Sequence, residues 1–78
     1  MIIRLRLIGP LRLPPAGRLV EWKCRKGIRV RTVLGKALGY TSKELGFIQI
    51  IRAGRPMHLD DVITGDAELQ VTMRLGGG

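Results

Sequence analysis

Cysteine, histidine and aromatic residues are scarce in this 78-residue chain, and their scarcity excludes several classes of function. A single cysteine, Cys24, has no partner for an internal disulfide and no thiolate set for a zinc site. His58 is the only histidine, so a Ser-His-Asp or Cys-His arrangement has to be built around it. The neighbouring Asp60 and Asp61 diverge on an extended segment and do not share a metal ion or a proton. The sequence therefore predicts no catalytic residues, no metal site and no enzyme activity of its own.

Long apolar runs and glycine-rich phosphate loops are also absent. No apolar run exceeds a few residues, which is too short to span a bilayer. The opening MIIRLRLIG has arginines inside its apolar stretch, unlike a secretory signal. No glycine-rich stretch lies between a strand and a helix with a following lysine or acidic ribose ligand. We therefore expect a cytoplasmic protein with no membrane contact and no bound nucleotide or other cofactor.

Acidic residues are few, and this gives the chain its charge. Fourteen lysines and arginines face six aspartates and glutamates, so the formal net charge is +8. Such an excess favours an anionic partner, which is a nucleic acid, a membrane surface or an acidic protein. An ordinary solvated surface is the plainer interpretation of the same composition.

Two segments near the N-terminus alternate in hydrophobicity with the period of a strand. They are IIRLRLI (2–8) and RLVEWKCR (18–25), and the proline-rich GPLRLPPAG between them predicts a loop. The two strands are expected to pair as a hairpin across this loop. The inward residues are predicted to be Ile3, Leu5 and Leu7 in the first strand and Val20, Trp22 and Cys24 in the second.

The period then changes to that of a helix. Apolar residues recur with helical spacing over 30–38, forming one stripe, and Gly39 is a plausible end. Gly35 within this segment costs up to about 1 kcal/mol relative to alanine, so the helix has to be short and packed. Thr41 and Glu44 have the spacing of a capping box, with room for a single turn. The stripe consists of Val30, Val33, Leu34, Ala37 and Leu38.

The remaining segments are predicted to be strands. FIQIIRAGRPM (47–57) is expected to turn at Ala53-Gly54, with Ile48 and Ile50 inward, and a turn is expected near Gly65-Asp66. The last strand, ELQVTMRL (68–75), is expected to bury Leu69, Val71, Met73 and Leu75. The resulting order β-β-α-β-β-β predicts an α+β fold in which a mixed sheet packs on one helix.

Three glycines follow the last strand in VTMRLGGG. Glycine loses the most backbone freedom on ordering, so a run of it contributes nothing to holding a fold together. We therefore expect one domain over residues 1–75 and a flexible glycine tail over 76–78. Deletion of the last two glycines is not expected to disturb the fold.

The strand order, RAGRPM, TGDAELQV and the final RLGGG together resemble the ubiquitin-like β-grasp sulfur carriers and small protein modifiers. The resemblance covers residues 2–78 and includes the thiamine-biosynthesis carrier, the molybdopterin synthase small subunit and small archaeal modifiers. It implies that a separate ubiquitin-activating-type enzyme uses ATP to adenylate the carboxylate of Gly78, with Gly76 and Gly77 as the tail. A thiocarboxylate for a sulfur-accepting enzyme, or conjugation to lysines of target proteins, would follow. The pathway (thiamine, molybdopterin or tRNA thiolation) and the choice between the two reactions stay open.

The same resemblance places the third and last predicted strands side by side. Phe47, Gln49 and Ile51 would then lie near Thr72 and Arg74 on the exposed face, as a docking patch for partners. Packing of Phe47 and Ile51 under a loop is the competing interpretation.

The basic charge supports an alternative function, because sulfur carriers of this kind are typically neutral to acidic. RNA would bind a basic face on the first hairpin, made by Arg4, Arg6, Lys23 and Arg25. The shortage of aromatic residues for base stacking disfavours this alternative. A purely structural subunit would leave the glycines unexplained.

Overall fold

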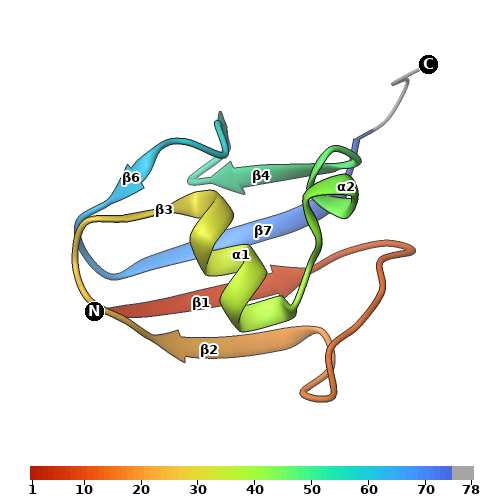
Figure 1. Cartoon of the computed structure of the whole chain (residues 1–78), viewed down its shortest axis with the longest axis horizontal. Helices are drawn as coiled ribbons and strands as arrows, with labels where there is room; N and C mark the ends of the chain where they lie inside the picture. Colours follow the sequence, from red (N-terminus) through yellow and green to blue (C-terminus); the bar gives the residue numbers. More distant parts are fainter. Residues whose placement is uncertain (75–78) are drawn as a thin grey trace.

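The computed structural model describes residues 1–74, which form a mixed sheet with a helix lying across one face (Figure 1). The larger sheet has the order β2-β1-β7-β4-β5. Its strands are β1 (Ile2–Leu7), β2 (Leu19–Lys23), β4 (Ile48–Arg52), β5 (Arg55–Met57) and β7 (Ala67–Met73). Helix α1 (Val30–Leu38) covers the sheet, and the one-turn helix α2 (Ser42–Leu45) follows it. The predicted α+β class is confirmed, whereas Leu75 and the predicted tail at 76–78 lie outside the described residues.

Strand β7 lies in the middle of the sheet. It runs parallel to β1, with Leu5 opposite Leu69, and antiparallel to β4, with Ile50 opposite Val71. Strand β1 also pairs antiparallel with β2, as the predicted first hairpin requires. The predicted adjacency of the third and last strands is confirmed by the β4–β7 pairing. Strand β7 is therefore held by β1 on one side as far as Val71 and by β4 on the other side as far as Met73.

The core lies between α1 and the inner face of the sheet. Alternation along β1 buries Ile3, Leu5 and Leu7, as predicted. Trp22 and Cys24 are half-buried and pack against the edge of this core, so Cys24 is a peripheral core residue. The predicted helical stripe is confirmed, since Val30, Val33, Leu34 and Leu38 are buried and Ala37 packs against them. The other buried strand residues are Val20, Ile48, Ile50, Leu69 and Val71.

The end of α1 and the start of α2 lie where local sequence signals predict them. Gly39 caps α1 in the left-handed conformation, with φ of 72°, and its N–H donates to the carbonyl of Gly35. In α2, the Thr41 side chain accepts a hydrogen bond from the Glu44 N–H, and the Glu44 carboxylate accepts one from the Thr41 N–H. The capping box is therefore present and holds a single helical turn.

Two short strands were not predicted. Strand β3 (Ile28–Arg29) pairs antiparallel with β6 (Val62–Ile63) in a separate two-stranded sheet. Two residues do not display the alternation that identifies a strand, so sequence periodicity gives no signal for them. The pairing buries Ile28 and Ile63 beside the start of α1.

The predicted turn between β4 and β5 is confirmed at Ala53 and Gly54, which have φ of 51° and 78°. Positive φ at both central residues is the geometry of a tight hairpin turn. Within residues 1–74, no helix is long and apolar enough to cross a membrane.

Candidate partner-binding surface at the end of β7

The end of β7 is anchored to β4 up to the last described residue. Ile48 lies opposite Met73, and beyond this pair the Arg74 N–H donates to the Phe47 carbonyl at 2.9 Å. Position 74 is therefore still part of the hydrogen-bonded framework. A protein that acts on the chain after Arg74 would therefore contact the surface around Arg74.

The predicted docking residues surround this end of β7. Thr72 lies opposite Gln49, and Ile51 lies two pairs further along, opposite Gln70. Phe47 is 58% exposed, so the alternative in which it packs under a loop is wrong. Ile51 is half-buried and Arg74 is exposed. The structure thus brings Phe47, Thr72 and Arg74 together and leaves Ile51 at the margin.

Two apolar residues at the same end of the sheet were missed by the sequence-based assignment. Ile8 and Leu19 are 42% and 62% exposed, and they line a shallow depression together with Gly9 and Arg18. The Ile8 N–H donates to the Val71 carbonyl at 2.9 Å, which places Ile8 beside the end of β7. The outward position of Ile8 in the strand alternation was a usable signal for it. We define the docking face as Ile8, Leu19, Phe47, Ile51, Thr72 and Arg74.

A groove of about 190 Å³ opens on the helix side of the same end. Its wall is mainly apolar and joins the proline-rich loop to β4 and β7. Phe47 belongs to both the docking face and the groove. The apolar lining residues are Pro10, Leu11, Tyr40, Phe47, Ile48 and Met73.

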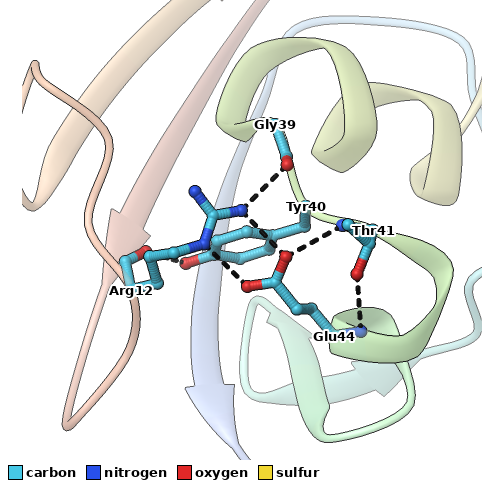
Figure 2. Close-up of polar contacts among 5 residues, drawn as sticks. All are labelled: Arg12, Gly39, Tyr40, Thr41 and Glu44. Atoms are coloured by element: carbon cyan, nitrogen blue, oxygen red, sulfur yellow. Dashed lines mark hydrogen bonds and ion pairs between the residues drawn. The ribbon is translucent and has the colours of Figure 1, made fainter.

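One arginine holds the proline-rich loop against this groove (Figure 2). Arg12 donates to both carboxylate oxygens of Glu44, at 2.7 and 2.8 Å, and to the Gly39 carbonyl at 2.9 Å. The Tyr40 hydroxyl donates to the Arg12 carbonyl at 2.7 Å, and the guanidinium lies 5.3 Å from the centre of the Tyr40 ring. The loop is therefore fixed through both the side chain and the backbone of one residue.

The charge of Glu44 is stabilised by these contacts. Hydrogen bonds from the Arg12 guanidinium and from the Thr41 N–H lower the pKa of Glu44 from 4.5 to about 2. The same carboxylate raises the pKa of Arg12 through their hydrogen bonds. Burial raises the pKa of Tyr40, which keeps its hydroxyl protonated as a donor. At neutral pH, Arg12 and Glu44 are thus both charged and Tyr40 is neutral.

The residues predicted to form a basic face do not form a purely basic surface. Arg4 pairs with Glu21 at 3.2 Å, and Arg6 pairs with Glu68 at 3.3 Å. Glu68 lies on β7, directly across from Arg4, so topology brings it onto the hairpin face. Lys23 and Arg25 are exposed and have no ion pair among the described residues.

The acidic residues beside His58 have structural roles. Asp61 accepts a hydrogen bond from the His58 N–H at 2.9 Å, and Asp60 accepts one from Arg31 at 2.7 Å. The Arg31 contact lowers the pKa of Asp60. No group of metal-ligating residues gathers in the part of the chain that the structure describes.

The chain matches the crystal structure of SAMP1 from Haloferax volcanii, a ubiquitin-like small archaeal modifier, with a TM-score of 0.72 over 100% of both chains. The chain has the ubiquitin-like β-grasp fold. Sequence identity in this match is 17%, and the sequence matches no protein-family model and no curated protein. The β-grasp fold expected from the resemblance is confirmed.

Proposed function

We propose that this β-grasp protein is a ubiquitin-like sulfur carrier or protein modifier that is activated at the carboxylate of Gly78. A separate adenylating enzyme would use ATP to form the acyl-adenylate. A sulfide-level sulfur donor would attack the adenylate and displace AMP to give a thiocarboxylate, or the amine of a lysine on a target protein would displace AMP, with loss of a proton, to give an amide. In this proposal the chain supplies the acyl group and its presentation, and the partner supplies the nucleotide site and the catalytic residues.

The observation that carries the proposal is that the sequence RLGGG begins directly after the last residue of a central strand. The residue before this run is Met73, which ends a central strand, and Arg74 is hydrogen-bonded to β4. The chain after Arg74 therefore starts from a rigid origin. A carboxylate in a partner's site needs such an origin, because a small misplacement of the reacting group costs much of the rate.

The glycines suit the reaction that we propose. A carboxylate is a poor electrophile, and adenylation attaches a better leaving group whose charge the enzyme has to stabilise. The site has to enclose the acyl group closely, and residues without a Cβ let foreign backbone approach from both sides. From Arg74, four further residues reach at most about 14 Å in extended form. The docking face would therefore rest against the same enzyme that holds Gly78.

The docking face has the composition of a transient interface. Exposed apolar side chains, notably Phe47 and Leu19, lie at the end of the sheet where Arg74 also lies. Apolar contact with a charged margin is typical of protein interfaces. The groove beneath Phe47 offers a further place for an apolar side chain of the partner.

An ATP–pyrophosphate exchange assay with the activating enzyme tests this function. We expect exchange with the full chain and none after deletion of Gly77 and Gly78, since the carboxylate would no longer reach the nucleotide. The deletion variant should keep its thermal unfolding transition. Gly65→Ala, a change that meets no atom within 4 Å, is the control and should leave exchange intact. Undiminished exchange by the deletion variant would contradict the proposal.

A further inference from the structure

The positive charge of the molecule is unevenly distributed once its ion pairs are considered. Four of the six carboxylates pair with Arg4, Arg6, Arg12 and Arg31. The remaining two, Asp61 and Asp66, accept hydrogen bonds from backbone N–H groups. No carboxylate within residues 1–74 is therefore paired with the cations of the connection between β2 and α1. We define the basic corner as these exposed cations: Lys23, Arg25, Lys26 and Arg29.

The backbone of the basic corner is held at several points. Lys23 ends β2 opposite Ile2, and the Cys24 N–H donates to the Met1 carbonyl at 3.0 Å. Gly27 adopts a φ of 79°, and its N–H donates to the Ile63 carbonyl at 2.9 Å. These contacts hold the four cations on one ordered segment, so a ligand that binds them need not order the backbone first.

The start of α1 adds to the positive potential. Arg29 is the N-cap residue, and the first turn of α1 contains no acidic residue. The positive end of the helix dipole therefore points toward the corner. The N–H groups of Val30 and Arg31 already donate to the Asp61 and Leu59 carbonyls, so this contribution is electrostatic only. Asp60 is near enough to Arg29 to be influenced by its charge, but its carboxylate is bonded to Arg31.

We propose that the basic corner binds the phosphate backbone of a nucleic acid, for which single-stranded RNA serves as the probe, without reading its bases. Backbone contacts need only several cations spaced along a surface, because each one displaces condensed counterions. Trp22 packs against the core, so the aromatic residue nearest in sequence is not free to stack on bases. Because the contacts need only cations and Trp22 is not free to stack, the basic corner would recognise its ligand by charge alone.

An acidic protein fits the same surface less well. Protein interfaces bury an apolar centre, whereas the corner itself presents cations and a glycine. Among the large apolar residues exposed in residues 1–74, only Val62 lies beside the corner, opposite Arg29. Three of the others, Ile8, Leu19 and Phe47, belong to the docking face, and Leu13 lies in the proline-rich loop.

The basic corner and the docking face lie at opposite ends of the sheet. Lys23 is beside the start of β1, whereas Arg74 lies beyond the end of β7, which runs parallel to β1. Six strand residues separate these ends by roughly 20 Å. Figure 1 shows the connection after β2 near the N-terminus and the end of β7 on the opposite side. RNA and an activating enzyme can therefore bind the same molecule together, and the RNA proposal does not depend on the fate of Gly78.

Fluorescence anisotropy with a labelled uridine homopolymer longer than about 16 nucleotides tests the proposal. The corner variant replaces Lys23, Arg25, Lys26 and Arg29 with glutamine. The control variant makes the same charge change at four other exposed cations without ion pairs in the described chain: Lys36, Lys43, Arg52 and Arg55. We expect the corner variant to lower the slope of log K against log salt by about 3, and the control to leave it near the wild-type value.

Replacement of Arg29 could disturb the start of α1, so a triple variant that retains Arg29 is a second test. This triple variant should lower the slope of log K against log salt by about 2. Equal losses in the corner and control variants would overturn the proposal, because binding would then follow net charge alone. Absence of RNA binding combined with corner-dependent binding of poly-glutamate would also overturn it and assign the surface to an acidic protein.

Discussion

At the scale of single residues, the pair of Arg12 and Glu44 explains how a proline-rich loop keeps a defined place beside the end of β7. Arg12 is bonded to both carboxylate oxygens and to Gly39, and Tyr40 is bonded to its backbone. Glu44 also completes the capping box of α2. One carboxylate therefore joins the loop to the helical connection across the groove.

Glu44→Gln tests the charge in this network, because glutamine can still form a capping box. The pKa of Glu44 is lowered in the folded state, so its contribution is present above 4.5 and is lost as pH falls through about 2. We expect the variant to be less stable than wild type above about pH 5, with the difference closing toward about pH 2. Urea unfolding across this range measures it.

The control is Glu21→Gln, which breaks the exposed Arg4 pair at 3.2 Å and should cost less. A stability difference for Glu44→Gln that stays constant from neutral pH to about pH 2 would show that charge is not the cause.

Phe47 gives a second prediction at this scale. It is 58% exposed, so Phe47→Ser should leave the unfolding temperature nearly unchanged while removing an apolar contact from the docking face. We expect roughly a tenfold rise in KM for activation, as for loss of an interface hot spot. Val62→Ser, at a residue 52% exposed beside the basic corner, should leave the KM unchanged. If Phe47→Ser and Val62→Ser changed the KM for activation equally, the activating enzyme would not bind at the docking face.

At the scale of elements, helix α1 has one glycine that favours its stability, at its end, and one that disfavours it, in its interior. Gly39 ends the helix with φ of 72°, where a side chain is strained. Gly35 lies in the helix interior, and a Cβ there would meet only the Tyr40 carbonyl oxygen at 3.8 Å. Backbone geometry therefore requires glycine at position 39 but not at position 35.

Alanine substitutions at the two sites should therefore have opposite effects. Gly35→Ala should stabilise the protein by up to about 1 kcal/mol, through better helix propensity. Gly39→Ala should destabilise it by about 1 kcal/mol or more, since alanine cannot take positive φ without strain. Chemical denaturation of the pair measures both, and the same sign for both would contradict the assignment of the cap.

Periodicity and local capping signals were sufficient to predict most of these elements. The alternation of Ile3, Leu5 and Leu7 and the helical stripe ending at Leu38 predicted which faces are buried. The β3–β6 pairing was not accessible, since two residues carry no period. The alternation of Leu69 and Val71 implies that Glu68 points outward. It does not reveal that Glu68 lies across from Arg4, because that contact depends on a parallel pairing between distant strands. The sequence pattern therefore does not predict that acidic and basic side chains mix on the outer face of the first hairpin.

At the scale of the whole molecule, the two ends of the β-grasp sheet have different characters. The end of β7 combines exposed apolar residues, a groove and the anchored Arg74. The opposite end carries the cations of the basic corner, which have no carboxylate partner within residues 1–74. This separation would let one end serve the proposed activation while the other holds the proposed anionic ligand. The net charge of +8 comes from the basic corner and from cations scattered elsewhere.

Mass spectrometry of N-terminally tagged protein purified from its own host tests the central claim most directly. It gives the intact mass of the protein and, after tryptic digestion, the peptides of the proteins that copurify with it. We predict a species with one oxygen replaced by sulfur, or target lysines bearing Leu75-Gly76-Gly77-Gly78 after cleavage at Arg74. Either product should disappear when Gly77 and Gly78 are deleted. Unmodified protein alone, from cells with an active sulfur pathway and with no such remnant on any lysine, would contradict the account.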